Sequence, residues 1–202
     1  MTRLSARLSA ITLALLLIGF SSILHGQQAS GQANAGWITL FDGKSLEGWS
    51  PIGDATWRVE DGAIVTDKGK GYLVSKNTYT DYEIHAEFWV SDDANSGVFI
   101  RCTDPAKVDS KTAYEVNIFD QRPDPNYGTG AIVDVAKAAT VLKTGGKWNT
   151  YEIIAKGPKF TVTLNGVRTV DGAEDAKHAS GHIALQGFAG TIKFRKVDIK
   201  PL

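Results

Sequence analysis

Apolar and polar residues alternate in short segments along this chain after residue 36, and helical periodicity is almost absent. In 114–120, for example, Val116 and Ile118 fall on one face of an extended strand, whereas Glu115 and Asn117 fall on the other. Gly, Asp, Asn and Pro separate these segments. The pattern predicts an all-β chain, in which only 134–139, opened by an Asp suited to an N-cap, is expected to form a helical turn.

The number and spacing of the alternating segments indicate a sandwich of two antiparallel sheets. Asn165-Gly166 is a strong hairpin signal, because both positions of the turn need a positive φ. The segments are long for an immunoglobulin-type sandwich, and a jelly roll of curved sheets with a concave outer face fits them better. The predicted strands are 37–41, 56–66 (turned at Asp61-Gly62), 71–75, 81–90, 97–101, 113–119, 148–155, 160–164, 167–170, 181–186 and 191–199.

Residues 1–26 have the order of a secretory signal peptide. Arg3 and Arg7 precede an apolar run over 8–20, and small and polar residues follow. We expect cleavage between 26 and 35, a single domain over 36–202, and a secreted or periplasmic location. The apolar run is short for a membrane span, and a retained N-terminal anchor is the alternative interpretation.

Charge and cysteine content narrow the function classes. Without Arg3 and Arg7, 20 Lys and Arg stand against 22 Asp and Glu, so the exported chain has a net charge near −2. This balance, without basic clusters, argues against nucleic acid or an anionic membrane as partner. Cys102, the single cysteine, allows no internal disulfide, and we interpret it as a buried, inert thiol. The oligomeric state is left open.

Outward-facing polar and aromatic residues of four predicted strands form one candidate groove if these strands are neighbours. Carboxylates, imidazoles, amides and rings of this kind bind the hydroxyl groups and the apolar face of a sugar. The residues are His85, Glu87 and Trp89 in 81–90, Phe99 and Arg101 in 97–101, Glu115 and Asn117 in 113–119, and His182 and Gln186 in 181–186.

Each of these residues also has a structural interpretation, which stays open. The alternatives are a cross-strand ion pair for Glu87 and Arg101, solvated positions for His85 and His182, and a capped sheet edge for Trp89. Glu115 is the residue for which a functional interpretation is favoured most, because Asn117 lies two positions along the same face.

The loop 120–130 leaves directly from the Glu115 strand and combines stiff prolines with flexible glycines, as loops that wall a binding site often do. We therefore expect Asp120 to contact a substrate. Asp120, Asp124 and Asn126 carry oxygen atoms that suit Ca²⁺, but their spacing matches no cation-binding loop. We predict no cofactor and leave a divalent metal open.

Several well-known catalytic motifs are missing from the sequence. GxSxG, HExxH, the P-loop and the Rossmann fingerprint are absent. A retaining glycosidase needs two carboxylates close together, and the position two after Glu115 is an amide. Ordinary two-carboxylate glycoside hydrolysis is therefore a weak hypothesis.

A series of motifs runs through the chain in a recognisable order. They are Trp37–Trp49, Trp57–Gly62, Asn95–Arg101, Tyr114–Asn117, Gly146–Asn149, Leu164–Gly166, Gly181–Gln186 and Phe194–Val197. Together they resemble the 3-keto-disaccharide hydrolase domain family, long catalogued as a domain of unknown function. Many members carry Gln where this chain has Asn117, a shorter amide with the same hydrogen-bonding groups but a different reach.

The resemblance implies a concanavalin A-like jelly roll that acts on glycosides already oxidised at the sugar 3-position. A base would remove the C2 proton, the C1 substituent would leave by elimination, and water would add back. Our hypothesis takes Glu115 or a His as the base, Arg101 as the enolate stabiliser, and His182 or His85 as the acid. The substrate-binding residues would be Glu87, Trp89, Phe99, Asn117, Asp120 and Gln186.

Two other function classes stay open beside the enzyme. A jelly roll with such a face also serves as a sugar-binding module without catalysis, and the fold does not decide between them. A protein-interaction sandwich is the third alternative. The expected partner in the first two cases is a carbohydrate.

Overall fold

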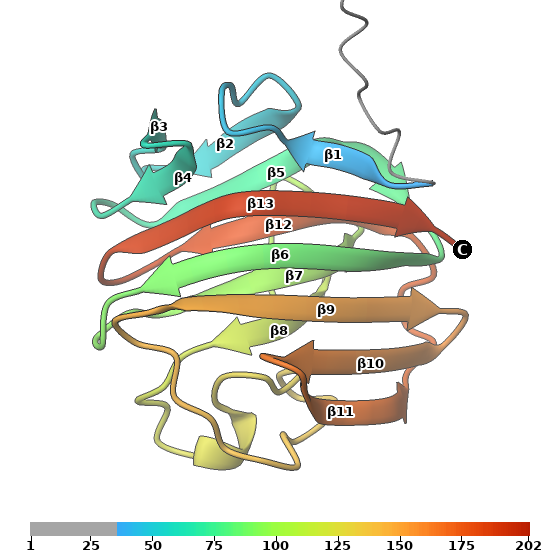
Figure 1. Cartoon of the computed structure of the whole chain (residues 1–202). Helices are drawn as coiled ribbons and strands as arrows, with labels where there is room; N and C mark the ends of the chain where they lie inside the picture. The colour runs from blue at the N-terminus through green and yellow to red at the C-terminus, as the bar shows by residue number, and fades with distance from the viewer. Residues whose placement is uncertain (1–35) are drawn as a thin grey trace, which may run out of the picture. The chain divides into compact units, whose positions relative to one another are not determined.

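The computed structural model describes residues 36–202, so the signal peptide predicted over 1–26 and its cleavage region lie outside the described residues. Within 36–202 the strands form two antiparallel sheets (Figure 1). Sheet A has the order β11-β10-β9-β6-β13-β4-β3, with β1 also paired to β13, and sheet B has the order β2-β5-β12-β7-β8.

The strands that these residues form agree with most of the predicted segments. Sheet A consists of β1 (Ile38–Phe41), β3 (Arg58–Glu60), β4 (Ala63–Thr66), β6 (Tyr82–Val90), β9 (Trp148–Lys156), β10 (Lys159–Leu164), β11 (Val167–Glu174) and β13 (Ile192–Pro201). Sheet B consists of β2 (Trp49–Gly53), β5 (Gly71–Tyr79), β7 (Ser96–Cys102), β8 (Tyr114–Ile118) and β12 (Gly181–Gly187). The predicted sandwich of two antiparallel sheets is confirmed.

The core lies between the two sheets and follows the period-two pattern. In β6, Ile84 and Phe88 are fully buried, and the ring of Phe88 lies 4.9 Å from that of Tyr151 on β9. Sheet B contributes Val98 and Ile100 to the same cluster. Burying a large apolar side chain of this kind stabilises the fold by about 1.5–3 kcal/mol. Packing of this kind explains how a domain with a single cysteine holds its two sheets together.

Of the two local turns predicted from the sequence, the hairpin turn is confirmed and the helical turn is wrong. Asn165 and Gly166 have φ values of 51° and 78°, which confirms the hairpin between β10 and β11. The helical turn expected at 134–139 is wrong. Asp134 has a φ of 61° and sits in a tight turn closed by reciprocal backbone hydrogen bonds between Ile132 and Ala136. A residue in the left-handed region does not serve as a helix N-cap, which needs an extended backbone at that position.

Strand β2 is absent from the predicted segments because Pro51 interrupts its pattern. It lies at an edge of sheet B, where a missing N–H group is tolerated. Residues 36–202 contain no apolar helix long enough to span a membrane. Cys102 is fully buried, and burial raises the pKa of its thiol, as expected for an inert cysteine.

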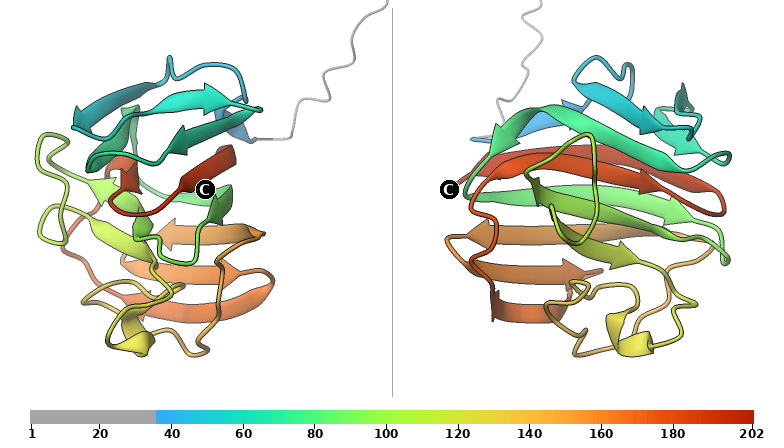
Figure 2. Two further views of the ribbon diagram at one scale, coloured as in Figure 1. Left: turned by 90° about the vertical axis from the view of Figure 1, so that its left-hand side faces the viewer. Right: turned by 180° about the vertical axis from the view of Figure 1, so that it is seen from behind.

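Two loops shape the surface of sheet B that faces away from sheet A, which we call the outer face of sheet B. The loop 103–113 joins β7 to β8, and the right-hand view of Figure 2 shows it crossing this face. Its residues Val108 and Ala113 pack on Phe99 and Ala184. The loop 119–147 follows β8 and contains the 3₁₀ helix η1 (Pro125–Tyr127). The loops leave only part of the outer face open.

Candidate functional site

Strand register brings a small set of polar groups together on the outer face of sheet B. Gln186 on β12 pairs with Tyr72 on β5, and Glu115 on β8 pairs with Phe99 on β7. Leu185 pairs with Val98, and the strands are antiparallel, so Gln186 lies beside Gly97, the residue that precedes Val98 on β7. Tyr72, Gln186 and Glu115 thus come from three strands of one sheet.

Gly97 provides the room for the Glu115 side chain. A Cβ atom at residue 97 would lie 3.2 Å from Cγ of Glu115 and 3.3 Å from its Oε1. The Glu115 side chain therefore lies over Gly97 of β7. Strand β7 lies between β8, which carries Glu115, and β12, which carries Gln186. A larger residue at 97 would crowd the carboxylate, so this glycine fixes where the acid can lie.

The environment of Glu115 favours its protonated form. Burial raises the pKa of Glu115 to about 7, although the positive charge of Arg122 lowers it and Asp134 raises it slightly. No hydrogen bond within residues 36–202 contributes to this pKa. A half-buried carboxyl group with a pKa near neutrality and no hydrogen-bond partner is suited to exchange a proton.

Gln186 and Tyr72 form the second half of the candidate site. Nε2 of Gln186 donates a hydrogen bond of 3.4 Å to the Tyr72 hydroxyl group, and Tyr72 rests edge-on against Phe99 with ring centroids 5.2 Å apart. Burial is also the main cause that raises the pKa of Tyr72. The Gln186 Oε1 atom is buried without a partner in residues 36–202. An unpaired buried acceptor costs stability, and a ligand hydroxyl group would satisfy it.

Arg101 does not face this site, and its expected place beside Glu115 is wrong. The strand pairing between β7 and β12 is irregular between His182 and Ala184, and Arg101 has a φ of 53°. This bulge breaks the alternation, so that Cys102 takes the outer face while Arg101 is buried with 1% exposure. The guanidinium carbon lies 5.3 Å from the ring centroid of Phe160 on sheet A.

The guanidinium group of Arg101 is fully used in holding chain segments together. It donates hydrogen bonds to the backbone oxygens of Thr80, Gly157 and His178, at distances of 2.6–3.1 Å. It also forms an ion pair of 3.0 Å with Asp81. These contacts join the β5–β6 turn, the β9–β10 turn and the segment before β12. Arg101 is therefore a structural residue in this protein.

His85, Glu87 and Trp89 lie on the opposite side of the sandwich, on the face of sheet A that points away from sheet B. Glu87 pairs with Arg195 at 2.6 Å and lies 3.8 Å from His85, and the ammonium group of Lys193 lies 5.3 Å from the ring centroid of Trp89. The predicted convergence of these three residues with Glu115 is wrong. Alternation shows which residues point outward, but both sheets have an outward face.

Phe99, Asn117 and Asp120 are close to the site but are engaged in structural contacts. Phe99 is 1% exposed and supports Tyr72 from below, so its ring does not reach solvent. Asn117 is fully buried and donates to the Tyr127 backbone oxygen. The Asp120 carboxylate accepts hydrogen bonds from Thr129, Thr144 and Gly145. Asn117 and Asp120 hold the loop 119–147 in place, and the predicted contact of Asp120 with a substrate is not supported by this geometry. The Oδ1 atom of Asn117, like Oε1 of Gln186, is buried without a partner in residues 36–202, so the contact of Asn117 with a ligand stays a prediction.

His182 lies on the outer face of sheet B but apart from Gln186. The two are four residues apart on β12, which corresponds to roughly 13 Å along a strand. Between them Ala184 belongs to the apolar cluster under loop 103–113. The His182 Nδ1 atom lies 2.7 Å from the Ser75 backbone oxygen, which favours a proton on Nδ1. The loop thus separates His182 from Glu115.

The oxygen-bearing residues considered for a metal ion are engaged in hydrogen bonds within the loop 119–147. Residues 36–202 hold no group of three His, Cys, Asp or Glu side chains placed to bind a metal ion. Asp124 accepts hydrogen bonds from the backbone and side chain of Asn126 as the N-cap of η1, while Asp120 is occupied as described above.

Sequence reasoning missed two residues of the site. Tyr72 falls in a predicted strand, but one aromatic residue beside a glycine gave no signal of its own. Arg122 lies in the loop 120–130, and its charge acts on Glu115 only through the folded position of that loop, which has no local sequence signal.

The raised pKa of Glu115 predicts a pH-dependent stability that Glu115→Gln removes. Between pH 4.5 and about 7 the unfolded chain releases a proton that the folded protein keeps, so the contribution of Glu115 to the free energy of unfolding falls as pH rises. The loss levels off above pH 7 and is at most about 3 kcal/mol. Denaturant unfolding of both proteins at pH 4.5, 6 and 8 measures the difference, and a difference that is constant with pH would contradict the assigned pKa.

Comparison with known proteins finds a domain family and relatives that this chain is similar to. Residues 36–200 match the family of the 3-keto-alpha-glucoside-1,2-lyase-like domain. A 3-keto-disaccharide hydrolase from Bacteroides thetaiotaomicron is 27% identical over 151 residues, covering 59% of this chain and 52% of that protein. The chain thus spans about half the length of the curated relative it matches.

Solved structures show the same fold. A candidate glycosyl hydrolase from Parabacteroides distasonis is 23% identical, with a TM-score of 0.72 over 83% of this chain and 94% of that chain. The carbohydrate-binding module CBM66 from Bacillus subtilis is 18% identical, with a TM-score of 0.60 over 76% of this chain and 95% of that chain. These likenesses confirm the predicted jelly-roll fold class.

Proposed function

The chain belongs to the family of the 3-keto-alpha-glucoside-1,2-lyase-like domain, as its motifs predicted, and we propose that it cleaves glycosides oxidised at the sugar 3-position with Glu115 as the general base. The observation that carries this proposal is a half-buried carboxyl group with a pKa of about 7, near the unpaired acceptor of Gln186 on the same outer face. The signal peptide predicted over 1–26 supports action outside the cytoplasm.

The chemistry needs one base rather than two matched carboxylates. The C3 ketone acidifies the C2–H bond, so the Glu115 carboxylate takes the C2 proton and the electron pair of that bond forms an enolate with C3 and its oxygen. The enolate then collapses to a C1–C2 double bond, and the bond from C1 to the leaving oxygen breaks. The leaving group departs as an alcohol once it gains a proton, and addition of water across the double bond gives net hydrolysis.

Charge and hydrogen bonding at the site suit the other two tasks. The Arg122 guanidinium acts on Glu115 through its charge, and in our proposal it stabilises the enolate. In our proposal the Tyr72 hydroxyl group, which is protonated at neutral pH and whose pKa burial raises further, donates to the leaving oxygen. These two residues replace Arg101 and His182 in the hypothesis drawn from the sequence.

The proposal predicts release of a chromogenic aglycone from a 3-keto-α-glucoside, with a rate that rises with pH. Because only the ionised Glu115 removes a proton, kcat/KM should fall about tenfold for each pH unit below 6 and level off above 8. Stopped or continuous absorbance assays between pH 5 and 9 measure this profile. Release that is independent of pH across this range would contradict Glu115 as the base.

A sugar-binding module without catalysis is the second candidate. The likeness to CBM66 shows a shared fold, and the unpaired Gln186 acceptor would serve binding as well as turnover. Saturable binding of the 3-keto-glucoside without release of its aglycone would favour this candidate. Absence of both binding and release would favour the protein-interaction sandwich instead.

A further inference from the structure

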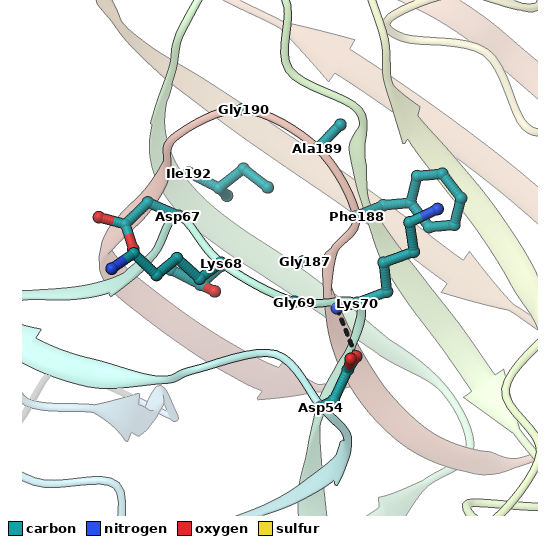
Figure 3. Close-up of a pocket in the computed structure, with 11 residues that line it drawn as sticks. Asp54, Asp67, Lys68, Gly69, Lys70, Gly187, Phe188, Ala189, Gly190 and Ile192 are labelled. Atoms are coloured by element: carbon teal, nitrogen blue, oxygen red, sulfur yellow. Dashed lines mark hydrogen bonds between the residues drawn. The ribbon is translucent and has the colours of Figure 1, made fainter.

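Two hollows continue from the candidate site in a direction that the proposed mechanism does not use. One has a volume of 260 Å³ and is lined by Tyr72, Ile52 and Val108. The other has a volume of 330 Å³ and lies between the turn before β5 and the loop 188–191 that follows β12 (Figure 3). Lys70 and Phe188 line both, so the two hollows adjoin at these side chains, and we call the pair of hollows the trough.

Phe188 stands at the junction of the two hollows with an unusual exposure for its type. It is 41% exposed, and the ammonium group of Lys70 lies 4.2 Å from its ring centroid. Figure 3 shows the Lys70 side chain alongside the ring. The ammonium group lies over one face of the ring, and the exposed remainder of Phe188 together with this hydrogen-bond donor can bind a ring with an apolar face and polar edges.

The inner part of the trough contains a buried polar atom without a partner. Thr66 lines this hollow, is 2% exposed, and its Oγ1 atom has no hydrogen-bond partner within residues 36–202. The indole Nε1 of Trp57 is also buried without a partner, and both side chains border Gly187. Buried groups of this kind are rare in folded proteins and mark places where a ligand or water is bound.

Side chains of both charges line the trough. The Asp67 carboxylate is paired with Arg58, and Asp54 accepts a hydrogen bond of 2.6 Å from the backbone N–H of Lys70. Lys68, Lys70 and Lys107 line the two hollows beside these two acids, so basic side chains are in excess there. The side chains thus offer both hydrogen-bond donors and acceptors to a ring with hydroxyl groups.

The loops 103–113 and 119–147 limit the space around Glu115, and the loop 103–113 also lines the hollow beside Tyr72. Beside Glu115 the loop 119–147 is fastened over β8 through Asn117 and Asp120. Toward His182 the loop 103–113 covers the sheet. A substituent on C1 of a sugar bound between Glu115 and Gln186 can therefore extend past Tyr72 toward Phe188.

We propose that the trough from Tyr72 to Thr66 is the aglycone subsite, in which a ring-shaped leaving group stacks on Phe188. The inference rests on the proposed function, since it assigns the departing half of the same substrate. The shared chemistry is a six-membered ring with an apolar face, which either a second sugar or an aryl group supplies. Lys68 and Lys70 would donate to hydroxyl groups of a sugar ring.

Phe188→Ala tests the subsite against Trp148→Ala, which removes an exposed aromatic ring (38% exposed) from sheet A. Three substrates are compared: methyl 3-keto-α-glucoside, its 4-nitrophenyl counterpart and a 3-keto-disaccharide. Phe188→Ala should lower kcat/KM about tenfold for the two ring aglycones and change the methyl glycoside less than twofold. Trp148→Ala should change none of them.

Lys68→Met separates the two sources of the ring, because it should slow the disaccharide and spare the nitrophenyl substrate. Equal effects of Phe188→Ala on all three substrates, or no effect on any, would overturn the subsite. If the wild-type protein turns over none of them, the proposed function fails. In that case, NMR titration with phenyl and methyl α-glucosides tests whether a ring binds at Phe188. The wild type should bind the phenyl glucoside more tightly than the methyl glucoside, and Phe188→Ala should bind the two equally.

Discussion

Glu115→Gln is expected to lower kcat for a 3-keto-α-glucoside by about a thousandfold, the middle of the range for loss of a positioned general base. The amide keeps the shape of the carboxyl group and its place over Gly97, but it cannot accept the C2 proton. Binding through Gln186 and Tyr72 should survive, so KM should change little. Steady-state assays at pH 8 measure both constants.

The variant should also be at least as stable as the wild type above pH 7, because it removes the cost of burying an ionised carboxylate. This result separates a catalytic loss from a folding defect. Lys159→Ala is the matched control, since Lys159 is exposed on β10 and forms only a surface ion pair with Glu174. Retention of more than a tenth of wild-type kcat in Glu115→Gln would contradict the assigned role.

The sandwich was predictable because period-two alternation is a local signal that buried strands must obey. Ile84, Ala86 and Phe88 were placed inside correctly, and the Asn165-Gly166 turn fixed the β10–β11 hairpin. Family motifs added the fold class and the substrate hypothesis. Alternation does not report which sheet a strand joins, however. Glu87 and Glu115 both point outward as expected and lie on opposite faces of the sandwich.

The rest of the site depends on features that have no local signature. A single bulge at Arg101 moves its side chain from the outer face into the end of the sandwich. Asn117 alternates correctly, but the loop 119–147 folds back over it, so an outward position on an edge strand becomes a buried one. Arg122 comes near Glu115 through the same loop. Such loop placement is decided by long-range contacts, which the sequence does not display.

The structural role of Arg101 leads to the second large prediction. Arg101→Met should lower the free energy of unfolding by about 3–5 kcal/mol, because it leaves Asp81 and three backbone oxygens without their donor. For a domain of this size the melting temperature should fall by roughly 10–15 °C. Arg101→Lys should recover only part of this loss, since an ammonium group cannot replace the planar fork of donors. Thermal and denaturant unfolding measure all three proteins.

Arg195→Met provides the comparison on the surface, where the ion pair with Glu87 is half exposed and should contribute less than about 1 kcal/mol. Below its melting temperature Arg101→Met should keep kcat within about threefold of the wild type, because Arg101 is buried among segments that join the two sheets and does not touch the Glu115 site. If Arg101 instead stabilised the enolate, its loss would lower kcat by two orders of magnitude or more in a protein that still melts near the wild-type temperature. A large loss of kcat together with a near-normal melting temperature would mean that Arg101 belongs to the active site, and it would require a different arrangement of β7.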